Sequence, residues 1–206
     1  QYGDGMRLVN ATGTITSSTW TNGSSGLSLD RCEGMRLQDL ALLGNGMDLG
    51  IFGSTASHFT HGVENVSLTY GPLMILEGLA GVTIEDFGGS LYLIGCQDVV
   101  VRNSLLGRAG SGIALVECSN VEMLGNAMEN CTAGILAIDS QGLVWGNDLL
   151  YNEAQVVQIR SGLTFGKGYP IGGNHWSDKE GEDVRCGADQ DLPGADGIFD
   201  DAYDSS

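Results

Sequence analysis

The feature that most constrains the fold of this chain is a short repeated motif, in which a turn residue is followed by an apolar, a variable and a second apolar residue. From Val66 onward, the first apolar position of the motif recurs after 16, 17, 22, 22 and 20 residues. These later positions are Val82, Val99, Val121, Leu143 and Leu163. A period of about 20 residues is typical of solenoids, in which each repeat buries its apolar residues by stacking on its neighbours.

A second apolar motif follows the first in constant phase. Its copies begin at Leu91, Ile113, Ile135 and Val157, each 22 residues after the one before. Turn residues separate the motifs, and no long stretch has the apolar spacing of an amphipathic helix. The pattern therefore predicts an all-β fold, a parallel β-helix (β-solenoid) of roughly seven coils. Leucine-rich repeats share the period, but their L-x-x-L-x-L frame and helical return are missing.

The motif also predicts which side chains face the core. We expect one inward ladder in which the first apolar residues of successive coils stack: Val66, Val82, Val99, Val121 and Leu143. Trp145 has an inward position in the same pattern, so we expect it in the core.

Composition divides the chain into three expected parts. Residues 1–33 are rich in Ser, Thr and Gly and are predicted to form an irregular N-terminal coil segment. Residues 34–172 contain the β-helix repeats. Residues 173–206 are predicted to form an acidic C-terminal cap or arm, because 10 of the 26 acidic residues lie between Asp178 and Ser206.

The repeats resemble those of a known family. With Asn103, Gly125-Asn126 and Gly146-Asn147 at their corners, they are similar to pectate-lyase-like, right-handed β-helix repeats of the NosD type, which are abundant on archaeal cell surfaces. The tail resembles the ending of archaeal NosD-like surface proteins in Gly173-Asn-His-Trp-Ser-Asp178, Gly181, Asp183, Asp196-Gly-Ile198, Asp200 and Tyr203. It departs from that ending at His175, where an aromatic residue is usual. The resemblance implies a right-handed β-helix in the cell envelope, similar to a sheath or surface-layer protein of methanogenic archaea.

The acidic tail is a candidate metal site. Its carboxylates lie at short intervals among glycines, at Asp183, Asp189, Asp191, Asp196 and Asp200. Calcium prefers such hard oxygen ligands, and a folded cluster of carboxylates needs cations to offset its repulsion. The sequence therefore predicts calcium as a cofactor. The alternative is a solvated acidic arm.

The five cysteines are disulfide candidates. Cys96 and Cys118 lie 22 residues apart, so they should stack about 4.8 Å apart on successive coils, either as a disulfide or as a ladder of buried thiols. Cys32, Cys131 and Cys186 have no comparable partners, and the odd number leaves one thiol free or bonded to another molecule. Cys32 and Cys186 are the predicted intermolecular cross-links, because they lie near opposite ends of the coil stack.

Charge and sequons restrict the partners and the location. A net charge of -17 repels phosphate backbones, which excludes nucleic acid, and no apolar stretch is long enough to span a membrane. Four sequons, at Asn10, Asn22, Asn65 and Asn130, indicate a secreted, glycosylated protein in an oxidising, extracellular compartment.

Catalytic groups do not converge in the repeats. The neighbouring Glu85 and Asp86 would face opposite sides of a strand, and His58-x-x-His61 lacks a third ligand. We therefore predict a protein that is not an enzyme. It is expected to be an extracellular structural protein that forms a homopolymer, a cell-envelope layer or sheath, through β-edge pairing and intermolecular disulfides. The alternative is a carbohydrate-active enzyme or polysaccharide-binding module of the pectate-lyase-like class.

Overall fold

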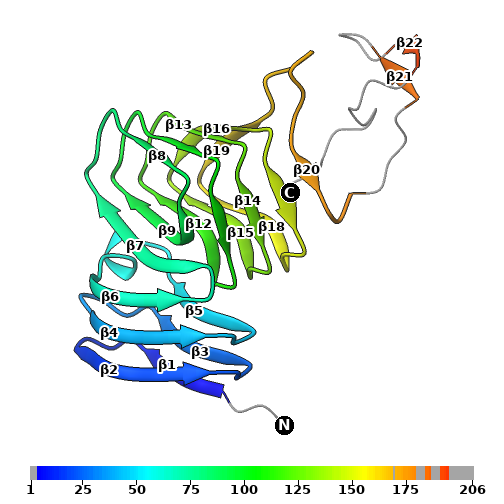
Figure 1. Cartoon of the computed structure of the whole chain (residues 1–206). Helices are drawn as coiled ribbons and strands as arrows, with labels where there is room; N and C mark the ends of the chain where they lie inside the picture. Colours follow the sequence, from blue (N-terminus) through cyan, green and yellow to red (C-terminus); the bar gives the residue numbers. More distant parts are fainter. Residues whose placement is uncertain (1–3, 169, 180–183, 187–190, 195–206) are drawn as a thin grey trace.

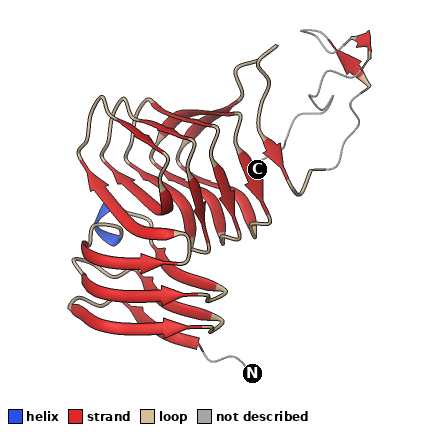
Figure 2. Ribbon diagram, viewed as in Figure 1, coloured by secondary structure: helices blue, strands red, loops and turns tan. Residues whose placement is uncertain are grey.

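The computed structural model describes residues 4–168, 170–179, 184–186 and 191–194. In these ranges the chain is built from β-strands, with one three-residue 3-10 helix, η1 (Ala56–His58) (Figure 2). The all-β solenoid of about seven turns predicted from the repeats is confirmed. The described residues contain no helix that is long and apolar enough to cross a membrane.

The first strands form an N-terminal stack of coils with two parallel sheets, β1-β3-β5 and β2-β4-β6 (Figure 1). Residues 1–33, expected to form an irregular coil segment, contain in their described part three strands, β1 to β3, that pair in register with each other or with the next coils. The strands are β1 (Asp4–Val9), β2 (Thr14–Thr21), β3 (Ser25–Asp30), β4 (Arg36–Leu43), β5 (Met47–Phe52) and β6 (Gly62–Leu68).

The later strands form a C-terminal stack with three strand rows, β7-β9-β12-β15-β18, β8-β10-β13-β16-β19 and β9-β11-β14-β17-β20. A separate antiparallel pair, β21 and β22, lies in the tail. The strands are β7 (Gly71–Glu77), β8 (Thr83–Glu85), β9 (Gly88–Ile94), β10 (Val100–Arg102), β11 (Leu105–Gly107), β12 (Ser111–Val116), β13 (Val121–Leu124), β14 (Ala127–Glu129), β15 (Ala133–Ile138), β16 (Gln141–Trp145), β17 (Asp148–Leu150), β18 (Ala154–Ile159), β19 (Gly162–Phe165), β20 (His175–Trp176), β21 (Arg185–Cys186) and β22 (Leu192–Pro193).

The chain reverses between the two stacks at Thr69 and Tyr70, where β6 and β7 pair antiparallel. A fully buried carboxylate holds this reversal. Asp48 Oδ2 accepts a hydrogen bond from the Thr69 amide (2.7 Å), and its Oδ1 accepts one from the Asn45 amide (3.0 Å). A buried carboxylate is tolerated only when its oxygens are paired in this way, so Asp48 fixes the point at which the stacking direction changes.

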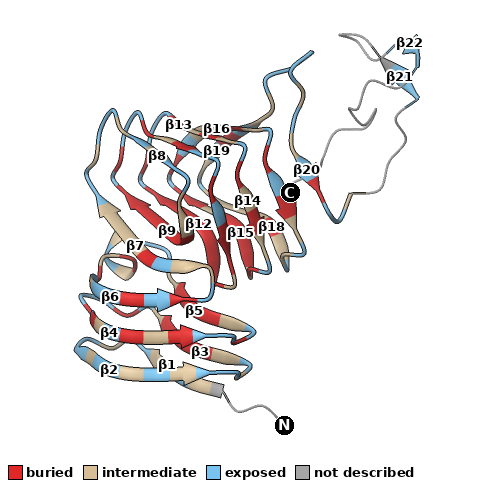
Figure 3. Ribbon diagram, viewed as in Figure 1, coloured by how far each residue is buried: buried red, intermediate tan, exposed pale blue. Residues whose placement is uncertain are grey.

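The two stacks share a core. The outer face of the sheet β9-β12-β15 contributes Tyr92, Val116 and Ile138 to the apolar cluster of the N-terminal stack, which includes Leu27 and Leu29. All six residues of β12 are therefore buried, as expected for a strand covered on both faces (Figure 3). The opposite face of the same sheet packs inside the C-terminal stack in a second cluster.

The inward ladder differs from the prediction at both ends. Val66 pairs with Leu40 in the N-terminal stack and so lies in another sheet. Leu143 lies opposite the outward-facing Glu122, whereas Val144 is buried opposite Met123. The register therefore stacks Val82, Val99, Val121, Gly142 and Leu163. A slip of one residue reverses the face of every side chain in a strand.

Trp145 is also not a core residue. Its indole Nε1 donates a hydrogen bond to Glu122 Oε1 (2.8 Å), and the ammonium of Lys167 lies 4.2 Å from its ring centroid. Lys167 also forms an ion pair with Glu122 (2.7 Å). The side chain therefore lies on the outer face of the sheet β10-β13-β16, in a cation–π contact.

Candidate functional site

Side-chain ladders at the corners join successive coils. Asn126 Oδ1 accepts from the Ser104 amide (3.0 Å), Asn147 Oδ1 from the Asn126 amide (3.0 Å), and Asn174 Oδ1 from the Asn147 amide (3.1 Å). Buried amide groups are satisfied in this way where the strands break. Asn174 belongs to the tail motif, and Trp176 of the same motif packs against Phe165 in the core (5.5 Å between ring centroids). This motif therefore completes the last coil.

Cys96 and Cys118 form part of a second ladder and carry free, buried thiols, as in the second of the two alternatives expected for this pair. Cys118 Sγ accepts a hydrogen bond from the Cys96 amide (3.4 Å), and Ser140 and Ser161 continue the ladder. Burial raises the pKa of the Cys118 thiol to about 11, which keeps it protonated and unreactive.

The remaining cysteines do not form the predicted cross-link, as far as the structure describes them. Cys32 has no exposed surface, so its thiol cannot meet another molecule while the coil is folded, and its assignment as an intermolecular cross-link is wrong. Cys131 is a free, buried thiol whose pKa burial raises to about 12. The side chain of Cys186 lies outside the described residues.

The predicted calcium site falls mostly outside the described residues. Asp183, Asp189, Asp196 and Asp200 are not described, and Asp191 is exposed. Calcium binding by the tail stays a prediction.

The asparagines of the four sequons are exposed and share one backbone conformation. Asn10, Asn22, Asn65 and Asn130 have φ between 50° and 56°, in the left-handed region. Asparagine tolerates this region better than most residues. The backbone thus explains asparagine at these corners whether or not glycans are attached, and glycosylation stays a prediction.

Within the part of the chain that the structure describes, no coil covers the apolar core of the N-terminal stack at the end formed by β1 and β2. Leu8, Ile15 and Trp20 are only half-buried, although they pack against the core. Their partners one coil further in have no exposed surface: Leu29, Leu37 and Leu42. Both strands are terminal in their sheets, and no described strand pairs with their outer edges. We call this surface the open end.

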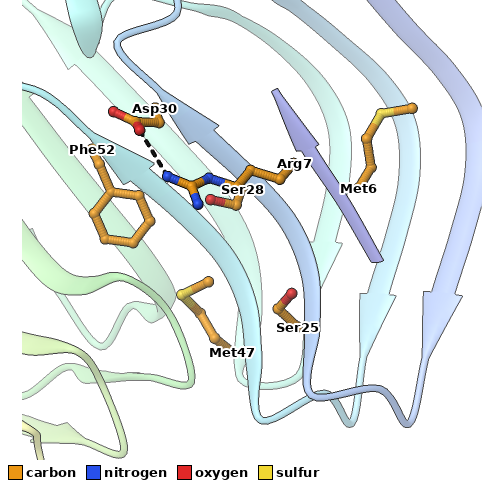
Figure 4. A pocket seen from close by; sticks show the side chains of 7 residues that line it. All are labelled: Met6, Arg7, Ser25, Ser28, Asp30, Met47 and Phe52. Carbon is orange, nitrogen blue, oxygen red and sulfur yellow. Dashed lines mark hydrogen bonds and ion pairs between the residues drawn. The ribbon is translucent and has the colours of Figure 1, made fainter. Parts of the chain in front are cut away.

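A groove lies along the outer face of the sheet β1-β3-β5 (Figure 4). Its volume is about 460 Å³, and Met47 also lines an adjoining hollow of about 350 Å³. The two hollows together are called the junction groove. The first is lined by Met6, Arg7, Ser25, Ser28, Asp30, Met47 and Phe52, and the second by Ser24, Gly46, Met47, Asn130, Cys131, Thr132, Tyr151 and Glu153.

The charges of the first hollow, Arg7 and Asp30, pair with each other. Asp30 accepts a hydrogen bond from Arg7 (2.9 Å) and another from Arg31 Nε (3.2 Å). The hydrogen bond from Arg7, together with the charge of Arg31, lowers the pKa of Asp30, so this carboxyl is ionised. The second hollow could not be found from the sequence, because its walls, residues 24–47 and 130–153, meet only through the chain reversal.

The histidines lie apart from these charges. His61 is buried, its Nδ1 accepts from the Met35 amide (3.3 Å), and its Nε2 has no hydrogen-bond partner. His58 Nδ1 accepts from the Ser54 amide (3.2 Å). His175 Nδ1 lies 3.3 Å from an oxygen of Asp148.

The stacked parallel strands, with side-chain ladders at their corners, define a parallel β-solenoid protein. The model of the NosD family, described as periplasmic copper-binding protein, matches residues 2–181. The chain therefore belongs to the NosD family. Searches of curated proteins and of solved structures give no significant match.

The family description names copper, but the described residues do not fit a copper site. Copper is held by several converging imidazole, thiolate or thioether ligands. His58 Nδ1 and His61 Nδ1 already accept backbone hydrogen bonds. Across the described ranges, no three His, Cys, Asp or Glu side chains come together as a metal-binding group.

Proposed function

We propose that this protein is a non-catalytic structural subunit of an extracellular assembly, in which copies join by strand pairing at the open end. The half-buried Leu8, Ile15 and Trp20 carry the proposal. An apolar core that is open at one end gains free energy when another coil covers it, at about 25 cal/mol for each Å² of apolar surface buried.

The backbone at the open end supports the same proposal. Gly13 O accepts a hydrogen bond from the Arg36 amide (2.8 Å), so it points toward β4. Successive residues of a strand direct their backbone groups to opposite edges, and the amide of Thr16 therefore points away from β4. Such an edge is a template for a strand of a second copy.

The family and the sequons support a location outside the cytoplasm for the proposed assembly. The family description is of a periplasmic protein, and all four sequon asparagines are exposed. We place the assembly in the cell envelope, as a layer or sheath. Contacts between copies are non-covalent at the four described cysteines, because these are buried. Cys186 remains the candidate for a covalent link.

Sedimentation velocity of two variants at the same position tests the role of the edge. Thr16→Pro removes the outward amide and leaves the bonds to β4, so it should shift the protein from oligomers to monomers. Thr16→Val keeps the amide and should assemble like the wild type. Monomeric wild-type protein at concentrations up to about 100 µM, where micromolar contacts are saturated, would refute assembly. Equal assembly of both variants would refute the role of the β2 edge in assembly.

A further inference from the structure

The floor of the junction groove is an aromatic platform built over a glycine. A Cβ on Gly50 would collide with the ring of Phe52 and would lie 3.0 Å from Cε of Met47, so both side chains fold over this glycine. A Cβ on Gly110 would lie 3.2 Å from Cζ of Phe52 and 2.8 Å from the Gly50 Cα. Because Gly50 and Gly110 have no side chains, they leave the space that the Phe52 ring occupies between the two stacks. Figure 4 shows this ring beside Arg7, Asp30 and Met47.

The adjoining hollow contains a second aromatic ring, in a strained position. The side chain of Tyr151 is 75% exposed, and its φ of 55° lies in the left-handed region. For a bulky residue this conformation is unfavourable, and unfavourable backbone geometry gathers at binding sites. Packing does not explain a tyrosine here, since most of its surface is in water.

The charge of the groove restricts the ligand. Asp30 is paired with Arg7 and Arg31, so no lone cation among them is left to bind a phosphate or carboxylate. The net charge of -17 opposes anions further. The floor is the face of a sheet, which presents side chains and not backbone edges, and it therefore offers nothing to the backbone of an extended peptide.

We propose that the junction groove binds an uncharged oligosaccharide. Sugar rings stack on Phe52 and Tyr151, and their hydroxyls form hydrogen bonds with Ser25 and Glu153. The open, two-part shape fits a chain of several sugars rather than an enclosed small molecule. This site lies on the sheet face of β1, β3 and β5 and is independent of assembly at the open end.

Isothermal titration calorimetry with cellohexaose and with hexa-N-acetylchitohexaose tests the site, and hexagalacturonate serves as the charged control. At least one uncharged hexasaccharide should bind, and hexagalacturonate should not. Phe52→Ala and Tyr151→Ala should each weaken binding by about tenfold or more, as expected of aromatic residues at the centre of an interface. Trp145→Ala, an aromatic change outside the groove, should leave the affinity unchanged.

The methionine methyl groups give a second readout that needs no variant. In ¹³C-methyl NMR spectra, the uncharged hexasaccharide should shift the signals of Met6 and Met47, which line the groove. The signals of the buried Met35 and Met123 should not move. The proposal is overturned if neither uncharged hexasaccharide binds at millimolar concentration, if Trp145→Ala abolishes binding, or if the Met47 signal is unaffected.

Discussion

Single residues at the corners set the path of the chain. In the described ranges, 16 non-glycine residues have positive φ, and ten of them are Asn or Asp, the types that tolerate this region. Arg31, Arg108 and Arg160 are exceptions, and Arg160 pairs with Asp139 of the coil before it (2.6 Å). Tyr151 is an exception whose side chain is largely exposed.

Tyr151→Asn should stabilise the fold by about 1 kcal/mol, because asparagine adopts a positive φ at a lower cost than tyrosine. Urea denaturation of the two proteins measures the difference. The same change should weaken oligosaccharide binding, because it removes the ring on which a sugar is proposed to stack. A variant that is less stable than the wild type would show that the tyrosine ring stabilises the fold. The positive φ of Tyr151 would then be no sign of a binding site.

His61 should make stability depend on pH. Burial lowers its pKa in the folded protein, whereas in the unfolded chain it titrates near 6.5. Below about pH 6.5 the unfolded chain therefore binds a proton that the folded protein does not, and stability falls as the pH decreases.

His61→Asn keeps an acceptor for the Met35 amide and removes the titration. Its stability should change less than that of the wild type between about pH 6.5 and 5. Thermal unfolding across this range measures the two curves, and identical slopes for wild type and His61→Asn would contradict the assignment.

At the scale of the strand, the repeat predicted the coils and the middle of the buried ladder, but neither of its ends. Val82, Val99 and Val121 stack as expected, and polar neighbours mark the outward face at Val82 (Thr83, Glu85) and at Val121 (Glu122). Leu143, Val144 and Trp145 are all apolar, so the pattern cannot tell which of them faces inward. The coil from Val121 to Gly142 is one residue shorter than the 22-residue spacing, and this moves Leu143 outward.

Two substitutions in adjacent positions test that register. Val144→Asp places an unpaired charge in the core and should destabilise the protein by several kcal/mol (about 3 or more). Leu143→Asp points outward and should cost less than about 1 kcal/mol. Chemical denaturation of both variants decides the register, and a larger loss for Leu143→Asp would restore the ladder expected from the spacing.

At the scale of the whole molecule, two stacks share one buried sheet. The rings of Phe59 and Tyr92 lie 6.2 Å apart across this contact, and the Arg108 guanidinium donates to Asn45 O (3.2 Å). The change of direction could not be predicted, because it depends on the pairing of Asp48 with Thr69, 21 residues away. The junction groove depends on this change of stacking direction, so it could not be predicted from the sequence either.

The expectation that copies pair at coil edges has a simple physical basis, since a solenoid buries each coil only against the next one. Spacing alone could not distinguish a disulfide between Cys96 and Cys118 from a thiol ladder. The two cysteines take the same ladder position as Ser140 and Ser161, where hydrogen-bonding groups join successive coils.

Hydrogen exchange measured by mass spectrometry at several protein concentrations tests assembly at the open end most directly. The account predicts that backbone amides of β2 exchange more slowly as the concentration rises, because a second copy pairs with them. The amides of β4, which already lie between two strands, should exchange at a constant rate. Exchange in β2 that does not change with concentration, in wild type and in Thr16→Pro alike, would contradict the claim that copies join at this edge.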